Sequence, residues 1–153
     1  MPIGRAILKN IATLGPVGYM PVAPGTWGTL VAAIAVYFIH VTEPVFLAIT
    51  IAITAIGIWA ADSAERTIGG KKDPGCIVID EVAGYFVSVA YLPRTWGYLV
   101  AAFFLFRIFD IVKPPPCHGL QRLRGGWGVM MDDIVAGIYA NTVIRLWLIA
   151  FLR

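Results

Sequence analysis

Five apolar stretches, separated by polar or Pro/Gly-rich loops, constrain the fold of this chain more than any other feature of its sequence. They cover residues 27–40, 45–61, 82–92 (or 77–92, if two acidic residues are tolerated inside), 96–109 and 134–152. Ala, Leu, Ile and Phe dominate, and the two-residue alternation of a strand is absent, so each stretch is predicted to be a helix. We therefore expect a single all-α domain over residues 1–153, a compact bundle of about five helices.

The small number of charges indicates what surrounds this bundle. Only 14% of the residues are charged, against about 25% in an average soluble domain. Because so few charges cannot cover a globule in water, we expect an integral membrane protein. A full crossing needs about 20 residues, and only the second and fifth stretches approach that length. Five spans, or two or three spans with the other helices lying shallow, are both compatible with the pattern. Residues 1–10 show no removable signal peptide.

Basic residues are distributed unevenly between the loops. If all five stretches cross, the N-terminal segment and the loops 62–81 and 107–133 share one face, while the loops on the other face contribute only Arg94. The first face holds nine of the 12 basic residues: Arg5, Lys9, Arg66, Lys71, Lys72, Arg107, Lys113, Arg122 and Arg124. By the positive-inside rule this face is cytoplasmic. Acidic residues do not follow that rule, yet all of them except Glu43 lie on the same face, which predicts an active site there.

Two polar clusters on this face precede apolar helices. In residues 23–29 (APGTWGT), Thr26 can cap the next helix, and glycines such as Gly25 leave backbone N–H groups open to an anion. A plain turn and cap is the alternative. In residues 77–84 (IVIDEVAG), Asp80 and Glu81 border an apolar helix, where carboxylates are costly unless they are paired or bind a metal. Solvated groups near a helix N-terminus are the alternative.

A third cluster begins at the end of the fourth apolar stretch. Arg107, Asp110 and Lys113 follow one another at i, i+3 spacing, which forms one charged stripe on a helix. Pro114 ends that helix and leaves Lys113 at its mouth. An internal ladder of ion pairs is the alternative interpretation.

The same cluster continues where the last apolar stretch begins. Asp132 and Asp133 precede this stretch, and Asp133, Gly137 and Asn141 share one helical face at i, i+4 and i+8. That face is small or polar throughout and can approach another helix, or a site, closely. Capping of a helix N-terminus by the two aspartates is the alternative.

Taken together, the three clusters are typical of phosphate chemistry that uses a cation. Five carboxylates would repel a phosphate unless cations lay between them, and Mg²⁺ is held by carboxylates together with phosphate oxygens. Nearby Arg and Lys complete the groups that phosphoryl transfer uses. Zinc is not expected, because His40 lies on the other face and His118 alone makes no zinc site. Attack by water and attack by a carboxylate both stay open.

The segments that carry these clusters resemble a known family. Residues 23–29, 78–81, 106–114 and 126–137 are similar to the hallmark motifs of phosphatidylglycerophosphatase A, and the similarity runs in order from about Gly15 to Asn141. The resemblance implies a phosphoric monoester hydrolase that uses Mg²⁺ to convert phosphatidylglycerophosphate to phosphatidylglycerol and phosphate in bacterial phospholipid biosynthesis. It implies a multi-pass protein of the cytoplasmic (inner) membrane with its active site facing the cytoplasm. Phosphatidylglycerophosphate and membrane lipids are the expected partners, and nucleic acid is not.

The matched motifs supply the candidate site residues. As catalytic residues and metal ligands we expect Asp80, Glu81, Asp110, Asp132 and Asp133. As substrate-binding residues we expect Gly25, Thr26, Arg107, Lys113 and Asn141. The family also includes soluble relatives of similar all-helical fold.

Two other classes of protein compete with this interpretation. Membrane alcohol phosphotransferases also act on phospholipid headgroups, but their aspartates lie along two consecutive helices, whereas here they come from separated loops. A non-enzymatic divalent-cation transporter needs acidic residues near the middle of the bilayer, and none lies in the middle of an apolar stretch here.

Overall fold

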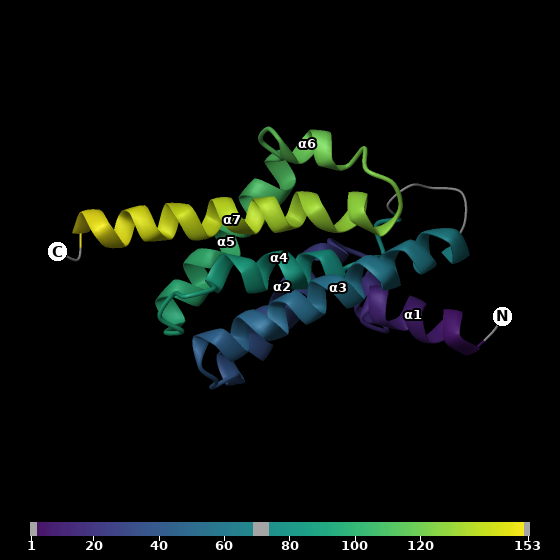
Figure 1. Ribbon diagram of the computed structural model, residues 1–153, viewed down its shortest axis with the longest axis horizontal. Coiled ribbons are helices and arrows are strands. Elements are labelled where there is room, and N and C mark those ends of the chain that lie inside the picture. Colours follow the sequence, from purple (N-terminus) through teal and green to yellow (C-terminus); the bar gives the residue numbers. More distant parts are fainter. Residues whose placement is uncertain (1–2, 69–73, 152–153) are drawn as a thin grey trace.

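The computed structural model describes residues 3–68 and 74–151, and all regular structure within them is helical. The elements are α1 (Ile3–Thr13), the 3₁₀ turn η1 (Val17–Tyr19), α2 (Pro24–Phe38), α3 (Glu43–Ile68), α4 (Ile79–Val89), α5 (Trp96–Val112), α6 (Cys117–Leu120) and α7 (Gly126–Phe151). The all-α prediction is confirmed. The expected count of about five helices is corrected to seven α-helices in this part of the chain (Figure 1).

The two additional helices are α1 and the four-residue α6. Leu8 and Ile11 of α1 pack against the core, and α1 contacts α3, while Arg5 stays exposed. Because polar residues interrupt the apolar ones, α1 forms no continuous apolar run and is amphipathic instead. Lys71 and Lys72, which contributed to the predicted charge asymmetry, lie outside the described residues.

Two helices, α3 and α7, are long and apolar enough to cross a membrane, each with 26 residues. They run along the long axis of the molecule in Figure 1. Only 28% and 22% of their most apolar windows are buried inside the protein. A core helix of a soluble domain would be mostly buried, so the large exposed side chains of these helices, such as Ile51 and Leu146, are those expected to face lipid.

The central helix α4 is buried on nearly all sides. It packs against α2, α3, α5 and α7, and nine of its 11 residues are buried. A helix of 11 residues rises only about 16 Å, roughly half of the ~30 Å hydrocarbon core of a bilayer. The helix α4 is thus short and enclosed by the other helices.

Two glycines allow α4 and α7 to cross closely. A Cβ atom added at Gly137 would lie 2.2 Å from the carbonyl oxygen of Gly84, and one added at Gly84 would lie 2.7 Å from the carbonyl oxygen of Asp133. The predicted close approach of the face that carries Gly137 is confirmed, and its partner is α4. Asp80 lies one turn before Gly84 and Asp133 one turn before Gly137, so this crossing places both carboxylates side by side.

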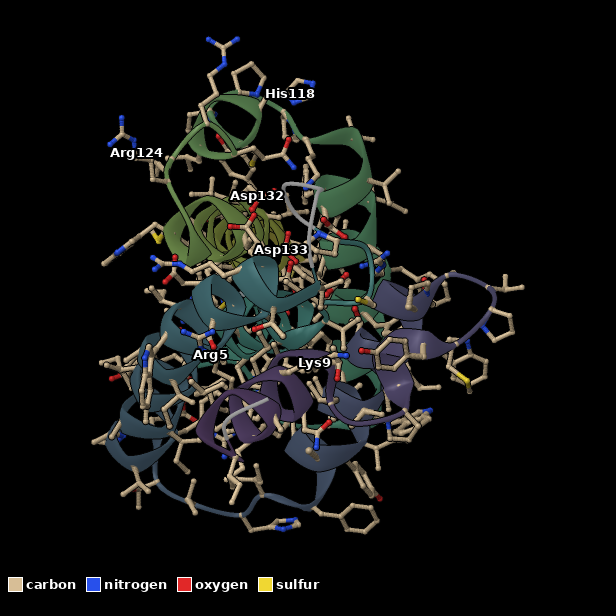
Figure 2. All side chains as sticks on the ribbon, turned by 90° about the vertical axis from the view of Figure 1, so that its right-hand side faces the viewer. Arg5, Lys9, His118, Arg124, Asp132 and Asp133 are labelled. Atoms are coloured by element: carbon tan, nitrogen blue, oxygen red, sulfur yellow. The ribbon has the colours of Figure 1, made fainter. Side chains whose placement is uncertain are left out.

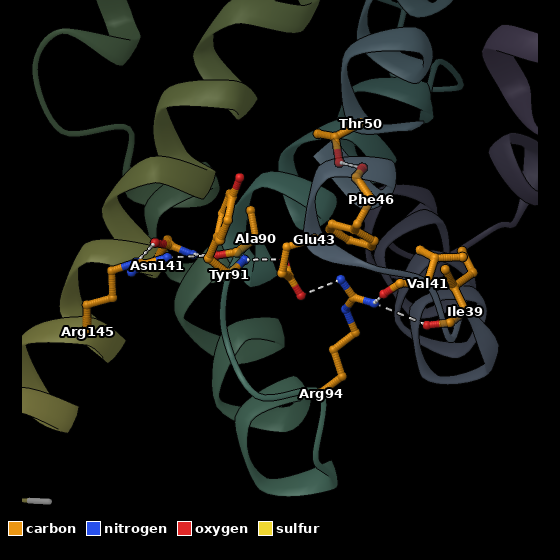
Figure 3. A network of polar contacts seen from close by, with 10 residues as sticks. All are labelled: Ile39, Val41, Glu43, Phe46, Thr50, Ala90, Tyr91, Arg94, Asn141 and Arg145. Atoms are coloured by element: carbon orange, nitrogen blue, oxygen red, sulfur yellow. Dashed lines mark hydrogen bonds and ion pairs between the residues drawn. The ribbon is translucent and has the colours of Figure 1, made fainter. Parts of the chain in front are cut away.

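A polar network fixes the opposite end of the bundle (Figure 3). The Nη2 atom of Arg94 lies 2.7 Å from Oε1 of Glu43, and its Nη1 donates to the carbonyl oxygens of Ile39 and Val41. The guanidinium also lies 4.1 Å from the ring centroid of Phe46. These contacts join the α2–α3 loop to the α4–α5 loop, the two loops that the sequence places on one face.

Candidate active site

The candidate site lies at the end of the bundle where α2, α4 and α7 begin and α5 ends. Figure 2 faces this end and shows Asp132 and Asp133 near the centre. Basic side chains lie around them, with Arg124 on one side and Arg5 and Lys9 of α1 on the other. Asp132 and Asp133 thus lie interior to these three basic side chains.

Three carboxylates from α4 and α7 form a cluster with the spacing of metal ligands. Asp80, Glu81 and Asp133 each offer one oxygen, and these oxygens lie within 4.8 Å of one another. Asp80 and Asp133 are buried and Glu81 is nearly so. The α4–α7 crossing brings them together, since the two helices contribute the ligands from the turn that precedes each glycine.

The unsatisfied oxygens of this cluster test whether a cation fits it. Within the cluster, Glu81 Oε2 and Asp133 Oδ2 are buried and have no hydrogen-bond partner, and the same holds for Oδ1 of the adjacent Asp132. Glu81, Asp110 and Asp132 also lie close enough to Asp133 to repel its charge. Buried charges without a partner are strongly disfavoured, and an oxygen-only donor set suits a hard cation such as Mg²⁺. The residues present therefore fit a divalent cation.

The other two acidic candidates, Asp110 and Asp132, form ion pairs with the basic residues. Asp110 Oδ2 lies 2.6 Å from Arg107 Nη1, and its Oδ1 lies 3.6 Å from Lys113 Nζ. Lys113 also donates a hydrogen bond to Oδ2 of Asp132. The predicted charged stripe is thus present, and the structure extends it from α5 to α7.

Glu81 connects the metal-ligand cluster to this basic pair. Its Oε1 lies 3.7 Å from Arg107 Nη1. The side chains of Arg107 and Lys113 are only 15% and 22% exposed, so a phosphate that reached them would be largely shielded from water. Carboxylates and cations therefore form one continuous polar site.

Lys113 keeps its positive charge in this environment. Burial disfavours the charged amine, but the hydrogen bond to Asp132 and the negative charges of Asp132, Asp133 and Asp110 outweigh burial. The pKa of Lys113 therefore lies above its ordinary value, and the amine is available as a fixed cation for a phosphate.

The glycine-rich start of α2 lies against the same site. A Cβ atom added at Gly25 would lie 2.0 Å from Glu81 Oε1 and 3.1 Å from Arg107 Nη1. A side chain at this position would require Glu81 Oε1 to shift, so glycine allows the α2 backbone to lie against the two charged groups as they are placed. The expectation that Thr26 caps the helix is wrong, because α2 begins at Pro24, its N-cap is Ala23 and Thr26 lies in its first turn.

The start of α7 removes one alternative interpretation of its aspartates. The sequence placed the beginning of this helix near Ile134, but α7 begins at Gly126 and has no acidic residue in its first turn. Asp132 and Asp133 therefore lie in the helix body, where neither caps an N-terminus. Both are 2% exposed, so their carboxylates need partners inside the protein.

The structure does not bring Asn141 to this site. Its side-chain amide donates to the carbonyl oxygens of Ser88 and Ala90 at the C-terminal end of α4, and Arg145 donates to its Oδ1 (Figure 3). Asn141 thus satisfies carbonyl groups that the end of a helix leaves open. Its contacts lie two turns of α7 beyond Asp133.

The sequence interpretation missed Gly84. Its importance follows from a repeated spacing, because a glycine follows Asp80 by four residues and another follows Asp133 by four residues. A small residue one turn after a buried acidic residue, on each of two apolar helices, is the pattern that a close helix crossing beside a polar site produces.

Comparisons with known proteins show the family of this chain. Residues 10–148 match the family described as Phosphatidylglycerophosphatase A. A Haemophilus influenzae protein named Phosphatidylglycerophosphatase A is 35% identical over 158 residues, which cover 93% of this chain and 96% of the relative. An Escherichia coli protein of the same name is 34% identical over 131 residues, covering 83% of this chain and 75% of the relative.

A third relative carries a different name. A Bacteroides thetaiotaomicron protein, named provisionally as a phosphatidylinositol-3-phosphatase, is 41% identical over 143 residues, covering 86% of this chain and 89% of the relative. All three names describe enzymes that remove phosphate. No solved structure matches this chain.

Proposed function

Since this chain belongs to the phosphatidylglycerophosphatase A family, we propose that it hydrolyses phosphatidylglycerophosphate to phosphatidylglycerol and inorganic phosphate. The observation that carries this proposal is the continuous polar site, in which two buried carboxylates and the nearly buried Glu81 adjoin two basic side chains that are largely shielded from water. Such a pairing suits a phosphate monoester, because the cations attract its oxygens and the carboxylates can hold the metal ion that phosphoryl transfer commonly uses.

Asp80, Glu81 and Asp133 are the residues that would hold Mg²⁺. A bound Mg²⁺ would polarise a phosphoryl oxygen and offset the repulsion between the substrate and the acidic cluster. The protein's own contribution is to fix these three oxygens on two helices that cannot separate easily, because their backbones touch at the glycine crossing. Preorganised ligands of this kind need little rearrangement when the reaction occurs.

Arg107 and Lys113 would bind the terminal phosphate. Asp110 forms ion pairs with both basic side chains, and Asp132 forms one with Lys113. These ion pairs limit the rotamers of the two long side chains before the substrate binds. Holding the phosphate in one orientation lowers the entropic part of the barrier. The backbone at Gly25 closes the side of the site next to Glu81 and Arg107.

The site is proposed to face the cytoplasm in a bacterial inner membrane. The excess of basic residues on the loops at this end supports that orientation. A single cysteine at Ser63 and one at Thr95, each in a background without Cys76 and Cys117, should react with impermeant thiol reagents from opposite sides of the membrane. Reaction of both from the same side would contradict the topology.

Phosphatidylinositol 3-phosphate is a second candidate substrate. The 41% identity to the Bacteroides thetaiotaomicron protein favours it. Both lipids carry a phosphate monoester on a polar headgroup, so the same metal and cation groups would act on either one. The two proposals differ in the headgroup that lies beyond the phosphate.

Phosphate release by the purified protein in detergent micelles tests the proposal. Phosphatidylglycerophosphate, phosphatidylinositol 3-phosphate and phosphatidic acid are compared at one surface concentration, with the Asp133→Asn variant as the background control. We expect the highest kcat/KM with phosphatidylglycerophosphate. A higher value with phosphatidylinositol 3-phosphate would favour the second candidate, and release from no lipid above the control would overturn the proposed function.

A further inference from the structure

A groove on the apolar surface lies between α5 and α7, away from the polar site. Its volume is about 440 Å³, within the range of roughly 300–1,000 Å³ that ligand pockets occupy. Ala101 and Leu105 of α5 form one wall, and Val143 and Trp147 of α7 form the other. Apart from one tyrosine, every residue that lines the groove is apolar or glycine.

The groove and the polar site lie on the same antiparallel pair of helices. Lys113, the C-cap of α5, pairs with Asp132 of α7 at the site. One turn back along α5 and two turns on along α7, the ring of Phe109 lies 5.6 Å from that of Tyr139. The residues that line the groove lie further along both helices, toward the end of the bundle opposite the site. The site and the groove therefore follow one another along the same pair of helices, with the contact between Phe109 and Tyr139 between them.

The distances along the helices agree with the dimensions of a lipid. Leu105 precedes Asp110 by five residues, so the near end of the groove lies about 8 Å from the site along α5. Trp147 follows Asp133 by 14 residues, so its far end lies about 21 Å away along α7. One leaflet of hydrocarbon is about 15 Å deep, half of the ~30 Å bilayer core. The groove thus lies at the depth of the acyl chains when the site lies at the headgroups.

We propose that this groove holds one acyl chain of the lipid whose phosphate is bound at the polar site. This inference rests on the proposed function and adds how the enzyme recognises the apolar part of its substrate. Small residues on α5 create the hollow: a Cβ atom added at Gly97 would meet nothing within 4 Å, and Ala101 follows one turn later.

The groove orients the substrate rather than increasing its affinity. Lipid tails are about as apolar as the groove, so moving a chain between them changes the free energy little. A chain held against α5 and α7 instead sets the depth and direction of the headgroup relative to the carboxylates. Since a misplacement of about 1 Å at the reacting group costs on the order of 100-fold in rate, chain placement affects kcat/KM strongly.

A smaller groove provides a matched control. It has a volume of about 150 Å³ and lies between α2 and α5, with Ala33 and Val100 among its lining residues. Ala101→Phe adds an aromatic ring to the proposed chain site, and Ala33→Phe adds the same ring to the smaller groove. Neither alanine touches the polar site, so each variant reports on its own groove.

The test compares phosphatidylglycerophosphate with two 16-carbon chains and with two six-carbon chains, which are too short to fill the groove. We expect Ala101→Phe to lower kcat/KM for the long-chain lipid by at least about tenfold and to leave the short-chain lipid within twofold. We expect Ala33→Phe to leave both lipids within twofold, and thermal unfolding in detergent to show both variants folded.

Several results would overturn the inference. They are an unchanged kcat/KM for the long-chain lipid in Ala101→Phe, an equal loss for both lipids in that variant, or the same chain-dependent loss in Ala33→Phe. Crosslinking from a cysteine at Val143 to a second copy of the chain would show that the protein itself covers this groove. Wild-type protein that hydrolyses neither lipid would instead contradict the proposed function, and this inference would fail with it.

Discussion

Replacing Gly137 with alanine tests whether the close crossing of α4 and α7 sets the geometry of the carboxylate cluster. The new Cβ atom would lie 2.2 Å from the carbonyl oxygen of Gly84 and 3.1 Å from Cβ of Val87, whereas ordinary contact begins near 3.4 Å. The helices must therefore separate by about 1.2 Å at this point (3.4 minus 2.2). Asp133 lies one turn away, so its carboxylate moves relative to those of Asp80 and Glu81.

The expected effect on activity is much larger than the effect on stability. Overpacking costs about 1–3 kcal/mol, and alanine regains about 1 kcal/mol over glycine inside a helix, so the net loss of stability should stay within about 2 kcal/mol. Metal sites tolerate displacements of only about 0.2 Å in their ligand distances. A displacement near 1 Å at a reacting centre costs on the order of 100-fold, so kcat/KM should fall by about that factor.

The assay measures phosphate release and thermal unfolding in detergent on the same preparations. Gly4→Ala in α1 is the matched control, because a Cβ atom there meets nothing within 4 Å, and its activity should equal that of the wild type. If folded Gly137→Ala retained more than half of the wild-type kcat/KM, the helix crossing would not set the site, and the argument from glycine spacing would be refuted.

Three further predictions concern individual side chains. Asp133→Asn should lower kcat/KM by orders of magnitude, and at least as much as Asp132→Asn, because Asp133 belongs to the carboxylate cluster. A loss of less than about twofold in both variants, under roughly 0.4 kcal/mol, would show that neither aspartate takes part in catalysis. Lys113→Met should raise KM, lower kcat, or both, while Mg²⁺ affinity changes little, and a selective loss of Mg²⁺ affinity would contradict its role as a phosphate ligand. Arg94→Met removes hydrogen bonds to Glu43 and two carbonyl oxygens at the far end of the bundle. Thermal and denaturant unfolding should therefore show that the free energy of unfolding falls by about 1–3 kcal/mol, while kcat/KM stays unchanged. A large loss of turnover in the folded variant would contradict this and show that the two ends of the bundle are coupled.

The sequence predicts the apolar helices well because a continuous apolar stretch indicates a helix without any knowledge of its tertiary contacts. The stretches 27–40, 45–61 and 96–109 all lie mainly within observed helices, and α5 ends just before Lys113, as Pro114 predicts. The start of α7 could not be predicted in this way. The two glycines at 125 and 126 suggest a loop, but Gly126 packs against the carbonyl oxygen of Ile58 in α3, and that tertiary contact allows the helix to begin there.

The partners that each acidic residue contacts also depend on tertiary structure. Composition and spacing identify five carboxylates, but only packing separates Asp110 and Asp132, which pair with Arg107 and Lys113, from the cluster of Asp80, Glu81 and Asp133. That separation follows from which face of α7 meets α4, and a one-residue change of register would alter it. Asn141 illustrates the same point, since it shares the stripe of Asp133 yet contacts the far end of α4.

Binding of a divalent cation to the purified protein tests the central claim most directly, because it needs no turnover. Mn²⁺, used in place of Mg²⁺ for its paramagnetic signal, is titrated into wild type, Asp133→Asn and the control Asp62→Asn, an aspartate that pairs with Arg66 instead. We expect wild type and Asp62→Asn to bind Mn²⁺ alike, Mg²⁺ to displace it, and Asp133→Asn to bind at least about tenfold more weakly, as the loss of a charged ligand requires. Equal Mn²⁺ affinity in all three proteins would contradict the assignment of Asp80, Glu81 and Asp133 as the metal site.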